Sequence, residues 1–115
     1  MLVSVLQAKI HRATVTDSNL NYEGSLTVDD DLLKRAGLVP FQQIQVYNIA
    51  NGQRFETYLM KGTPNTGEIV VNGAAARLVA VGDLIIIAAY GLVPVEDAAR
   101  WQPTVVLVDA RNRPK

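Results

Sequence analysis

The chain contains no cysteine and only one histidine, His11, among its 115 residues. Without cysteine there is no disulfide, no thiolate nucleophile and no cysteine-bound metal. A single histidine leaves little material for a multi-histidine metal centre or a Ser-His-Asp triad. We therefore expect no metal site and no chemistry that depends on a thiolate.

An excess of charge of one sign and a long apolar run are also lacking. Eleven Lys and Arg residues balance 11 Asp and Glu residues, so nothing favours nucleic acid or an anionic membrane as a partner. Zero net charge instead suits a protein that associates with itself. The longest apolar run, residues 84–95, is interrupted by Gly91 and Pro94 and is too short to cross a bilayer. The first residues lack the basic start of a signal peptide, so we expect a cytoplasmic protein.

Short β-branched and aliphatic segments dominate what the sequence does contain. Hydrophobic residues make up 49% of the chain, enough to build the core of one domain over residues 1–115. The clearest signal is Asn51-Gly52 between segments 43–49 and 54–59, which predicts a hairpin with a tight turn at positive φ. Further strands are expected at residues 2–16, 69–71, 84–88 and 104–108, with 84–88 buried on both faces. This pattern indicates a compact all-β barrel or sandwich.

Helical signals are short. Acidic residues at 29–31, basic residues at 34 and 35 and a final Gly37 predict a helix of about two turns. Single helical turns are expected at residues 74–78 and 96–100. Residues 17–25 have the composition of a polar loop, and residues 111–115 that of a frayed polar tail.

The stretch Tyr22-Glu23-Gly24-Ser25, which closes the polar loop, carries the most distinctive chemistry. Gly24 places no Cβ beside the carbonyl that Ser25 could attack, and it tolerates backbone angles that other residues resist. A serine hydroxyl held against the preceding carbonyl can shift the acyl group from nitrogen to oxygen. The resulting ester can then eliminate and leave a keto group at a new N-terminus. Gly-Ser pairs are common, however, and the alternative interpretation is a turn between two strands.

The first predicted strand carries further polar candidates for a site. In a regular strand Gln7, Lys9 and His11 share one face, where they either face solvent or line a pocket. His11 is then either a site residue or a satisfied polar residue at a contact between subunits.

The hairpin and the segment after it add candidates of the same ambiguous kind. Arg54 and Tyr58 share one face of the second hairpin strand, while Thr57 points to the other. From the residues alone, Arg54 and Tyr58 also fit an ordinary cross-strand surface pair. Asn72-Gly73 likewise fits a simple turn.

Taken together, several of these stretches resemble a known family. They are residues 6–12, 22–25, 51–58, 71–76 and 81–83, and they occur in the family's order and spacing over nearly the whole chain. The chain resembles the aspartate 1-decarboxylases, small pyruvoyl-dependent enzymes that make β-alanine for pantothenate and coenzyme A. The resemblance implies a six-stranded double-psi β-barrel with short helices, assembled as a homotetramer with active sites between subunits.

The resemblance further implies self-cleavage between Gly24 and Ser25. Residues 1–24 would become a β chain, and residues 25–115 an α chain that begins with a pyruvoyl group made from Ser25. Thr57 matches the residue that assists cleavage, and Tyr58 matches the proton donor. The positions that match the rest of the family's substrate-binding site are Lys9, His11, Tyr22, Arg54, Asn72, Gly73, Ala74 and Ala75.

Loss of CO2 from an amino acid leaves a carbanion, so a decarboxylase needs an electron sink, and the pyruvoyl group implied by the resemblance would be one. The chain has no phosphate-cradling glycine loop for pyridoxal phosphate. A pyruvoyl ketone from Ser25 would serve instead by forming a Schiff base with the substrate amine, and it needs no metal. The cations Arg54 and Lys9 suit the dicarboxylate L-aspartate better than the substrate of another pyruvoyl-dependent decarboxylase. A maturation factor would be one further partner. The alternative from another class is a non-catalytic homo-oligomeric β-barrel, a binding or scaffold module in which the chain stays intact.

Overall fold

In the computed structural model, which describes residues 1–115, eight strands form one mixed sheet in the order β2-β6-β3-β5-β4-β7-β1-β8. Their bounds are β1 Leu2–Thr14, β2 Asp17–Asn19, β3 Ser25–Asp29, β4 Gln43–Asn48, β5 Arg54–Gly62, β6 Ile69–Asn72, β7 Leu84–Pro94 and β8 Thr104–Leu107. The helices are α1 (Asp30–Ala36), α2 (Val95–Ala98) and the 3-10 helix η1 (Gly73–Leu78). The expected mainly β class is confirmed. The strand count is eight rather than six, and two short strands, β2 and β8, stand at the two ends of the sheet order.

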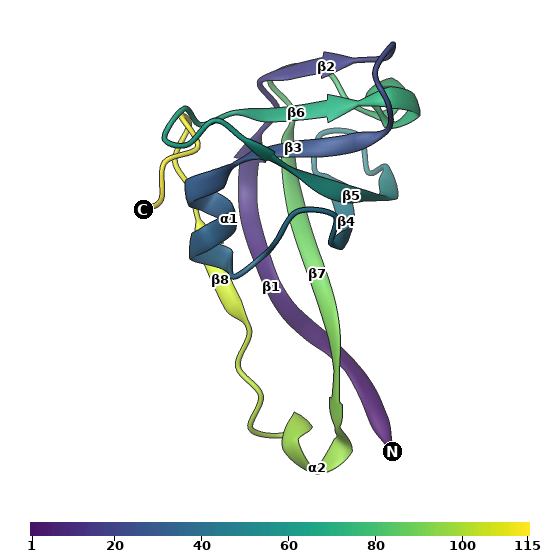
Figure 1. Cartoon of the computed structure of the whole chain (residues 1–115), viewed down its shortest axis with the longest axis vertical. Helices are drawn as coiled ribbons and strands as arrows, with labels where there is room; N and C mark the ends of the chain where they lie inside the picture. The colour runs from purple at the N-terminus through teal and green to yellow at the C-terminus, as the bar shows by residue number, and fades with distance from the viewer.

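Strands β1 and β7 form the long axis of the molecule (Figure 1). They pair antiparallel from Leu2 opposite Pro94 to Thr14 opposite Leu84, and the molecule measures 43 × 28 × 24 Å. β2, β3 and β6 gather at one end of this pair, whereas the N-terminus and α2 lie at the other (Figure 1). None of the helices has the length and apolarity that crossing a membrane requires.

Alternation along the strands separates a buried face from one that we call the outer face. Side chains such as Ile10, Val46 and Ile87 point into a core cluster of 20 buried residues. The alternate residues form the outer face: Lys9 and His11 of β1, Gln43, Gln45 and Tyr47 of β4, Arg54, Glu56 and Tyr58 of β5, and Ile86, Ala88 and Tyr90 of β7. The predicted shared face of Lys9 and His11 is therefore correct. Gln7 is the extra residue of a β-bulge between Leu6 and Ala8.

The polar loop predicted for residues 17–25 contains more strand than expected. β2 lies within it, and Ser25 is already the first residue of β3, which pairs parallel with β5 and antiparallel with β6. The chain does turn between two strands just before Ser25, as the alternative interpretation of Gly24-Ser25 supposed. A strand position gives the Ser25 side chain a defined direction that a loop would not.

Helix α1 follows β3 directly and confirms the predicted helix. The Asp29 carboxylate accepts a hydrogen bond from the Asp31 N–H at 2.8 Å, and Gly37 ends the helix at φ 70°. Residues Leu32 and Leu33 bury the apolar side of the helix in the core. The helical turns predicted for residues 74–78 and 96–100 correspond to η1 and α2, respectively.

The turn of the β4–β5 hairpin differs from the prediction. Residues 49–53 connect the strands, and only Gly52 of the Asn51-Gly52 pair has positive φ, at 77°. The cause is Asn48, which is buried and whose side-chain oxygen accepts the Ala50 N–H at 2.9 Å. Its backbone carbonyl accepts the Gly52 N–H at 2.9 Å, so the turn is wider than two residues.

Two further predictions are wrong, one about the strand at 84–88 and one about the C-terminal tail. β7 extends to Pro94, and its residues Leu84 and Ile86 are only half-buried because they lie on the outer face. The expected frayed tail is ordered around Asn112, whose residue exposure is 1%. Its amide accepts the Thr14 N–H at 2.7 Å and donates to the carbonyls of Thr14 and Gly67 at 2.8 and 2.7 Å.

Candidate active site

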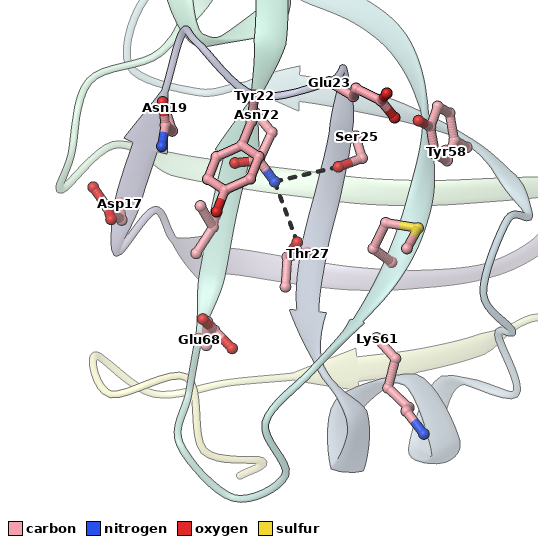
Figure 2. Close-up of a pocket in the computed structure, with 12 residues that line it drawn as sticks. Asp17, Asn19, Tyr22, Glu23, Ser25, Thr27, Tyr58, Lys61, Glu68 and Asn72 are labelled. Atoms are coloured by element: carbon pink, nitrogen blue, oxygen red, sulfur yellow. Dashed lines mark hydrogen bonds between the residues drawn. The ribbon is translucent and has the colours of Figure 1, made fainter.

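Ser25 lies at the start of β3 with only 5% of its surface exposed, directly opposite Asn72 of β6. The Asn72 side-chain N–H₂ donates to Ser25 Oγ at 3.2 Å and to Thr27 Oγ1 at 3.3 Å (Figure 2). Ser25 and Thr27 are two residues apart on one strand, so both hydroxyls point to the same side. Asn72 therefore holds the Ser25 hydroxyl in a fixed position.

The turn that precedes Ser25 packs against the start of η1. A Cβ placed on Gly73, whose φ is 75°, would lie 2.5 Å from Gly24 Cα and 2.6 Å from Gly24 N. The same atom would lie 3.1 Å from the Tyr22 carbonyl oxygen. No side chain of ordinary size fits this contact, so Gly73 is required for the turn to lie where it does. A Cβ on Gly24 itself would meet nothing within 4 Å.

An open pocket of about 480 Å³ surrounds the Ser25 side chain (Figure 2). Its lining combines residues of β2, β3, β5 and β6 with the turn: Asp17, Asn19, Tyr22, Glu23, Ser25, Thr27, Tyr58, Met60, Lys61, Glu68, Val70 and Asn72. Three carboxylates in this lining face one cation, Lys61. The pocket of a single chain is consequently acidic, which opposes the entry of an anion.

Tyr58 connects this pocket to the outer face. Its side chain lines the pocket and stacks on Phe41, with ring centres 6.4 Å apart. Thr57, the preceding residue, alternates to the opposite face, pairs with Ile44 and is not part of the pocket lining. Thr57 is therefore next to Tyr58 in sequence, but unlike Tyr58 it does not line the pocket around Ser25.

The other cationic candidates lie on the outer face, away from the Ser25 pocket. Arg54 is exposed, and its guanidinium carbon lies 4.3 Å from the centre of the Tyr47 ring. Lys9 lies three strands from β5, opposite Ala88 of β7. Neither Arg54 nor Lys9 lines the pocket around Ser25.

His11 lies near the end of β1, in a second pocket of about 550 Å³ with Arg12, Asp109 and Lys115. Partial burial lowers the pKa of His11, and the positive charges of Lys9 and Arg12 lower it further. Its Nδ1 atom is buried and has no hydrogen-bond partner within the chain. His11 is therefore a neutral imidazole at neutral pH and does not reach the Ser25 pocket.

The structure therefore brings together four of the residues singled out from the sequence, Tyr22, Ser25, Tyr58 and Asn72. Gly24 and Gly73 adjoin them through the backbone, and Ala74 and Ala75 follow in η1. Sequence reasoning missed Thr27, although its spacing from Ser25 would have indicated a shared side once a strand had been assigned there. The structure contains no cluster of three or more His, Asp or Glu residues spaced to hold a metal ion.

Fold and site together define a class: a small mixed β-barrel with a serine, preceded by glycine, held in a polar pocket at the start of a strand. A rationally designed double-psi β-barrel, mkDPBB_sym_86, has a similar fold, with a TM-score of 0.51 at 10% identity over 67% of this chain and 90% of that one. This likeness concerns the fold alone.

Sequence comparison is more specific. The model of the family described as aspartate decarboxylase matches residues 1–115, and the chain belongs to that family. Proteins named aspartate 1-decarboxylase from Caldicellulosiruptor bescii and Campylobacter hominis are 54% and 51% identical, over 98% and 97% of this chain and 88% and 96% of theirs. One of the same name from Leptospira biflexa is 53% identical over 100% of this chain and 98% of its own.

Proposed function

We propose that the protein is an aspartate 1-decarboxylase, which converts L-aspartate to β-alanine and CO2, and that Ser25 is the source of its pyruvoyl group. Family membership supports the reaction. The observation that carries the proposal is the position of Ser25: its hydroxyl is held by Asn72 in a polar pocket, directly after a glycine. The role of β-alanine as a precursor of pantothenate and the cytoplasmic location are further predictions of this proposal.

Maturation begins with attack of Ser25 Oγ on the Gly24 carbonyl carbon, which exchanges the peptide bond for an ester. Elimination then releases the Gly24 carboxylate, and hydrolytic loss of ammonia leaves a keto group on residue 25. Gly24 suits this step because it places no Cβ beside the carbonyl that Ser25 attacks. Thr57 does not line the Ser25 pocket of its own chain, so it would have to stabilise the oxyanion on the Gly24 carbonyl from a neighbouring subunit. The products are a β chain of residues 1–24 and an α chain of residues 25–115.

The pyruvoyl group supplies an electron sink for the carbanion that remains when CO2 leaves. Tyr58, on the wall of the pocket, returns a proton to the α-carbon as a general acid.

Arg54 is proposed to bind the β-carboxylate that aspartate retains. Its planar guanidinium can donate two parallel hydrogen bonds to one carboxylate. A strong cation on the departing α-carboxylate would stabilise the ground state instead and slow the loss of CO2. The α-carboxylate should therefore face a less charged wall, with the other candidate residues, including Lys9 and His11, completing the binding site.

The separation of these groups within one chain supports a site between subunits of a homotetramer. The Ser25 pocket is acidic on its own, whereas Arg54 and Lys9 lie on the outer face. A second copy that brings its outer face to the pocket would supply the cations that a dicarboxylate needs. Whether a maturation factor is required is measured by following cleavage of the purified chain with no other protein added.

Intact-mass measurement of the denatured protein, followed by an assay for CO2 release from L-aspartate, tests the proposal. We expect two fragments divided between Gly24 and Ser25, the larger one lacking the nitrogen of its terminal serine. An unmodified serine terminus would mean hydrolysis without activation. A single chain that persists on warming and releases no CO2 would favour the scaffold alternative, and cleavage without activity on aspartate would favour another substrate.

A further inference from the structure

Three side chains from three neighbouring strands form a connected unit on the outer face. Arg54 of β5 and Tyr47 of β4 are cross-strand partners, and the guanidinium carbon lies 4.3 Å from the ring centre. The hydroxyl oxygens of Tyr47 and Tyr90 of β7 are 2.7 Å apart. The roles proposed above use neither tyrosine.

We propose that Tyr90 is a positioning residue for substrate binding: its hydroxyl anchors Tyr47, whose ring holds the Arg54 guanidinium ready for a carboxylate. The inference rests on the proposed function of Arg54, which is to bind the retained β-carboxylate of aspartate. It adds a reason why that arginine, although exposed, is already oriented before the substrate arrives.

The ring contact suits this purpose because the guanidinium carbon lies over the ring, and a ring that meets the face of a guanidinium leaves its N–H edge open. The donors of an arginine lie in the guanidinium plane, so a ring against that plane does not compete with a carboxylate at the edge. An exposed arginine samples many rotamers, and ordering it beforehand reduces the entropy lost on binding. A Tyr47 ring tied at its hydroxyl is a firmer support than a free ring.

The neighbouring carboxylate is prevented from neutralising this arginine. Glu56 follows Arg54 by two residues on the same face, where an ion pair would otherwise be expected. Its two oxygens instead accept hydrogen bonds from the side chains of Gln43 and Gln45, at 2.9 and 2.8 Å. The ion pairs of the structure are Lys34–Asp30 and Arg100–Asp97, so the Arg54 guanidinium remains available.

The bond between the two tyrosines persists at working pH. Partial burial raises the pKa of Tyr47, the Tyr90 hydroxyl raises it further, and the charge of Arg54 acts in the opposite direction. Tyr47 is therefore a neutral phenol near pH 7, and either hydroxyl can donate to the other.

Steady-state kinetics of the matured protein with L-aspartate tests the inference. We expect Tyr90→Phe to raise KM about five-fold, the equivalent of one neutral hydrogen bond, and to change kcat by less than about two-fold. Tyr47→Phe removes the same bond, so the double variant should be no worse than either single variant. Tyr47→Leu also removes the ring under Arg54 and should raise KM further. The inhibition constant of succinate, which has both carboxylates but no amine, should rise in parallel.

Thr66→Val is a control in an exposed loop away from Arg54: it removes the hydrogen bond from the Thr66 hydroxyl to the Thr63 carbonyl at 2.8 Å and the one that this hydroxyl accepts from the Glu68 N–H at 3.2 Å, and it should leave KM unchanged. Arg54→Ala distinguishes a failure of the positioning inference from a failure of the proposed binding role of Arg54. If Arg54→Ala raises KM but Tyr90→Phe and Tyr47→Phe do not, the positioning inference is wrong and the proposed function stands. If Arg54→Ala leaves both KM and the succinate constant unchanged, the binding role of Arg54 is wrong and the inference fails with it. A loss confined to kcat in the tyrosine variants would also overturn it.

Discussion

At the scale of single residues, the contact between Gly73 and Gly24 bears most directly on Ser25. A Cβ at position 73 would lie 2.5 Å from Gly24 Cα, so Gly73→Ala must displace the turn that carries the Gly24–Ser25 bond, where we propose cleavage. We expect this variant to cleave at least about ten-fold more slowly, because small misplacements of reacting atoms have large effects on rate. The measurement is the intact mass of the purified chain over time.

Gly52→Ala is the control for Gly73→Ala, because it introduces the same backbone strain at positive φ without the steric clash. Gly52 has φ 77°, almost the value of Gly73, but a Cβ placed on it would meet no atom within 4 Å. Each substitution should cost roughly 1 kcal/mol of backbone strain. Only Gly73→Ala should slow cleavage, and equal cleavage rates in the two variants would contradict the steric argument.

At the scale of elements, Asp29 joins β3, α1 and the loop before β6. The residue is 2% exposed, and its carboxylate accepts hydrogen bonds from the N–H groups of Asp31, Asn65 and Gly67 at 2.8, 3.0 and 2.8 Å. Burial opposes ionisation, but these backbone donors outweigh it and hold the pKa of Asp29 below its usual range. The ionised Asp29 side chain thus caps α1 and also holds the loop before β6 against the start of that helix.

A lowered pKa in the folded state gives a definite sign to the pH dependence. The stability that Asp29 contributes is fully present above its unfolded pKa of about 4 and is lost as the pH falls below that value. We expect Asp29→Asn to lower the free energy of unfolding at pH 7 by about 2 kcal/mol and by less at pH 3. Chemical denaturation at both pH values measures the difference, with the exposed Asp31→Asn as control. A constant difference would show that the charge of Asp29 is not the cause.

At the scale of the whole molecule, the C-terminal segment closes the fold. Asn112 links β1 to the loop before β6 through the backbone of Thr14 and Gly67. Asn112→Ala would remove these hydrogen bonds from the backbone of half-buried Thr14 and buried Gly67, so we expect a loss of about 2–4 kcal/mol in unfolding free energy. Thermal denaturation against the exposed neighbour variant Arg111→Ala measures it. Equal melting temperatures would mean that the tail is dispensable.

The proposed assembly makes a prediction that no single chain can satisfy. If Ser25 and Arg54 of one site come from different subunits, Ser25→Ala and Arg54→Ala chains expressed together should form some complete sites. Each variant alone should be nearly inactive at low aspartate, whereas the mixed assembly should recover activity. Activity no greater than the sum of the separate variants would place both residues in the same chain's site.

Much of the local structure followed from the sequence. The acidic start and terminal glycine predicted α1, and alternation predicted the faces of β1 and β5, because both signals depend on neighbouring residues. The β4–β5 turn and the tail were predicted wrongly because buried Asn48 and Asn112 determine them. The Asn48 side chain binds Asp83 as well as Ala50 of its own turn, and the Asn112 side chain binds Gly67. Asp83 and Gly67 are distant in sequence, so local composition does not predict these bonds.

For the site, the sequence by itself determined the chemical inventory: a glycine–serine pair, tyrosines, an arginine whose guanidinium suits a carboxylate and no thiol. Only the tertiary structure decided which of these meet. Strand pairing places Asn72 opposite Ser25, and it places Arg54 opposite Tyr47, four residues along β5 from Tyr58, which lines the pocket. The physical reason is that hydrogen-bond register between distant strands, rather than spacing along the chain, determines which side chains are neighbours.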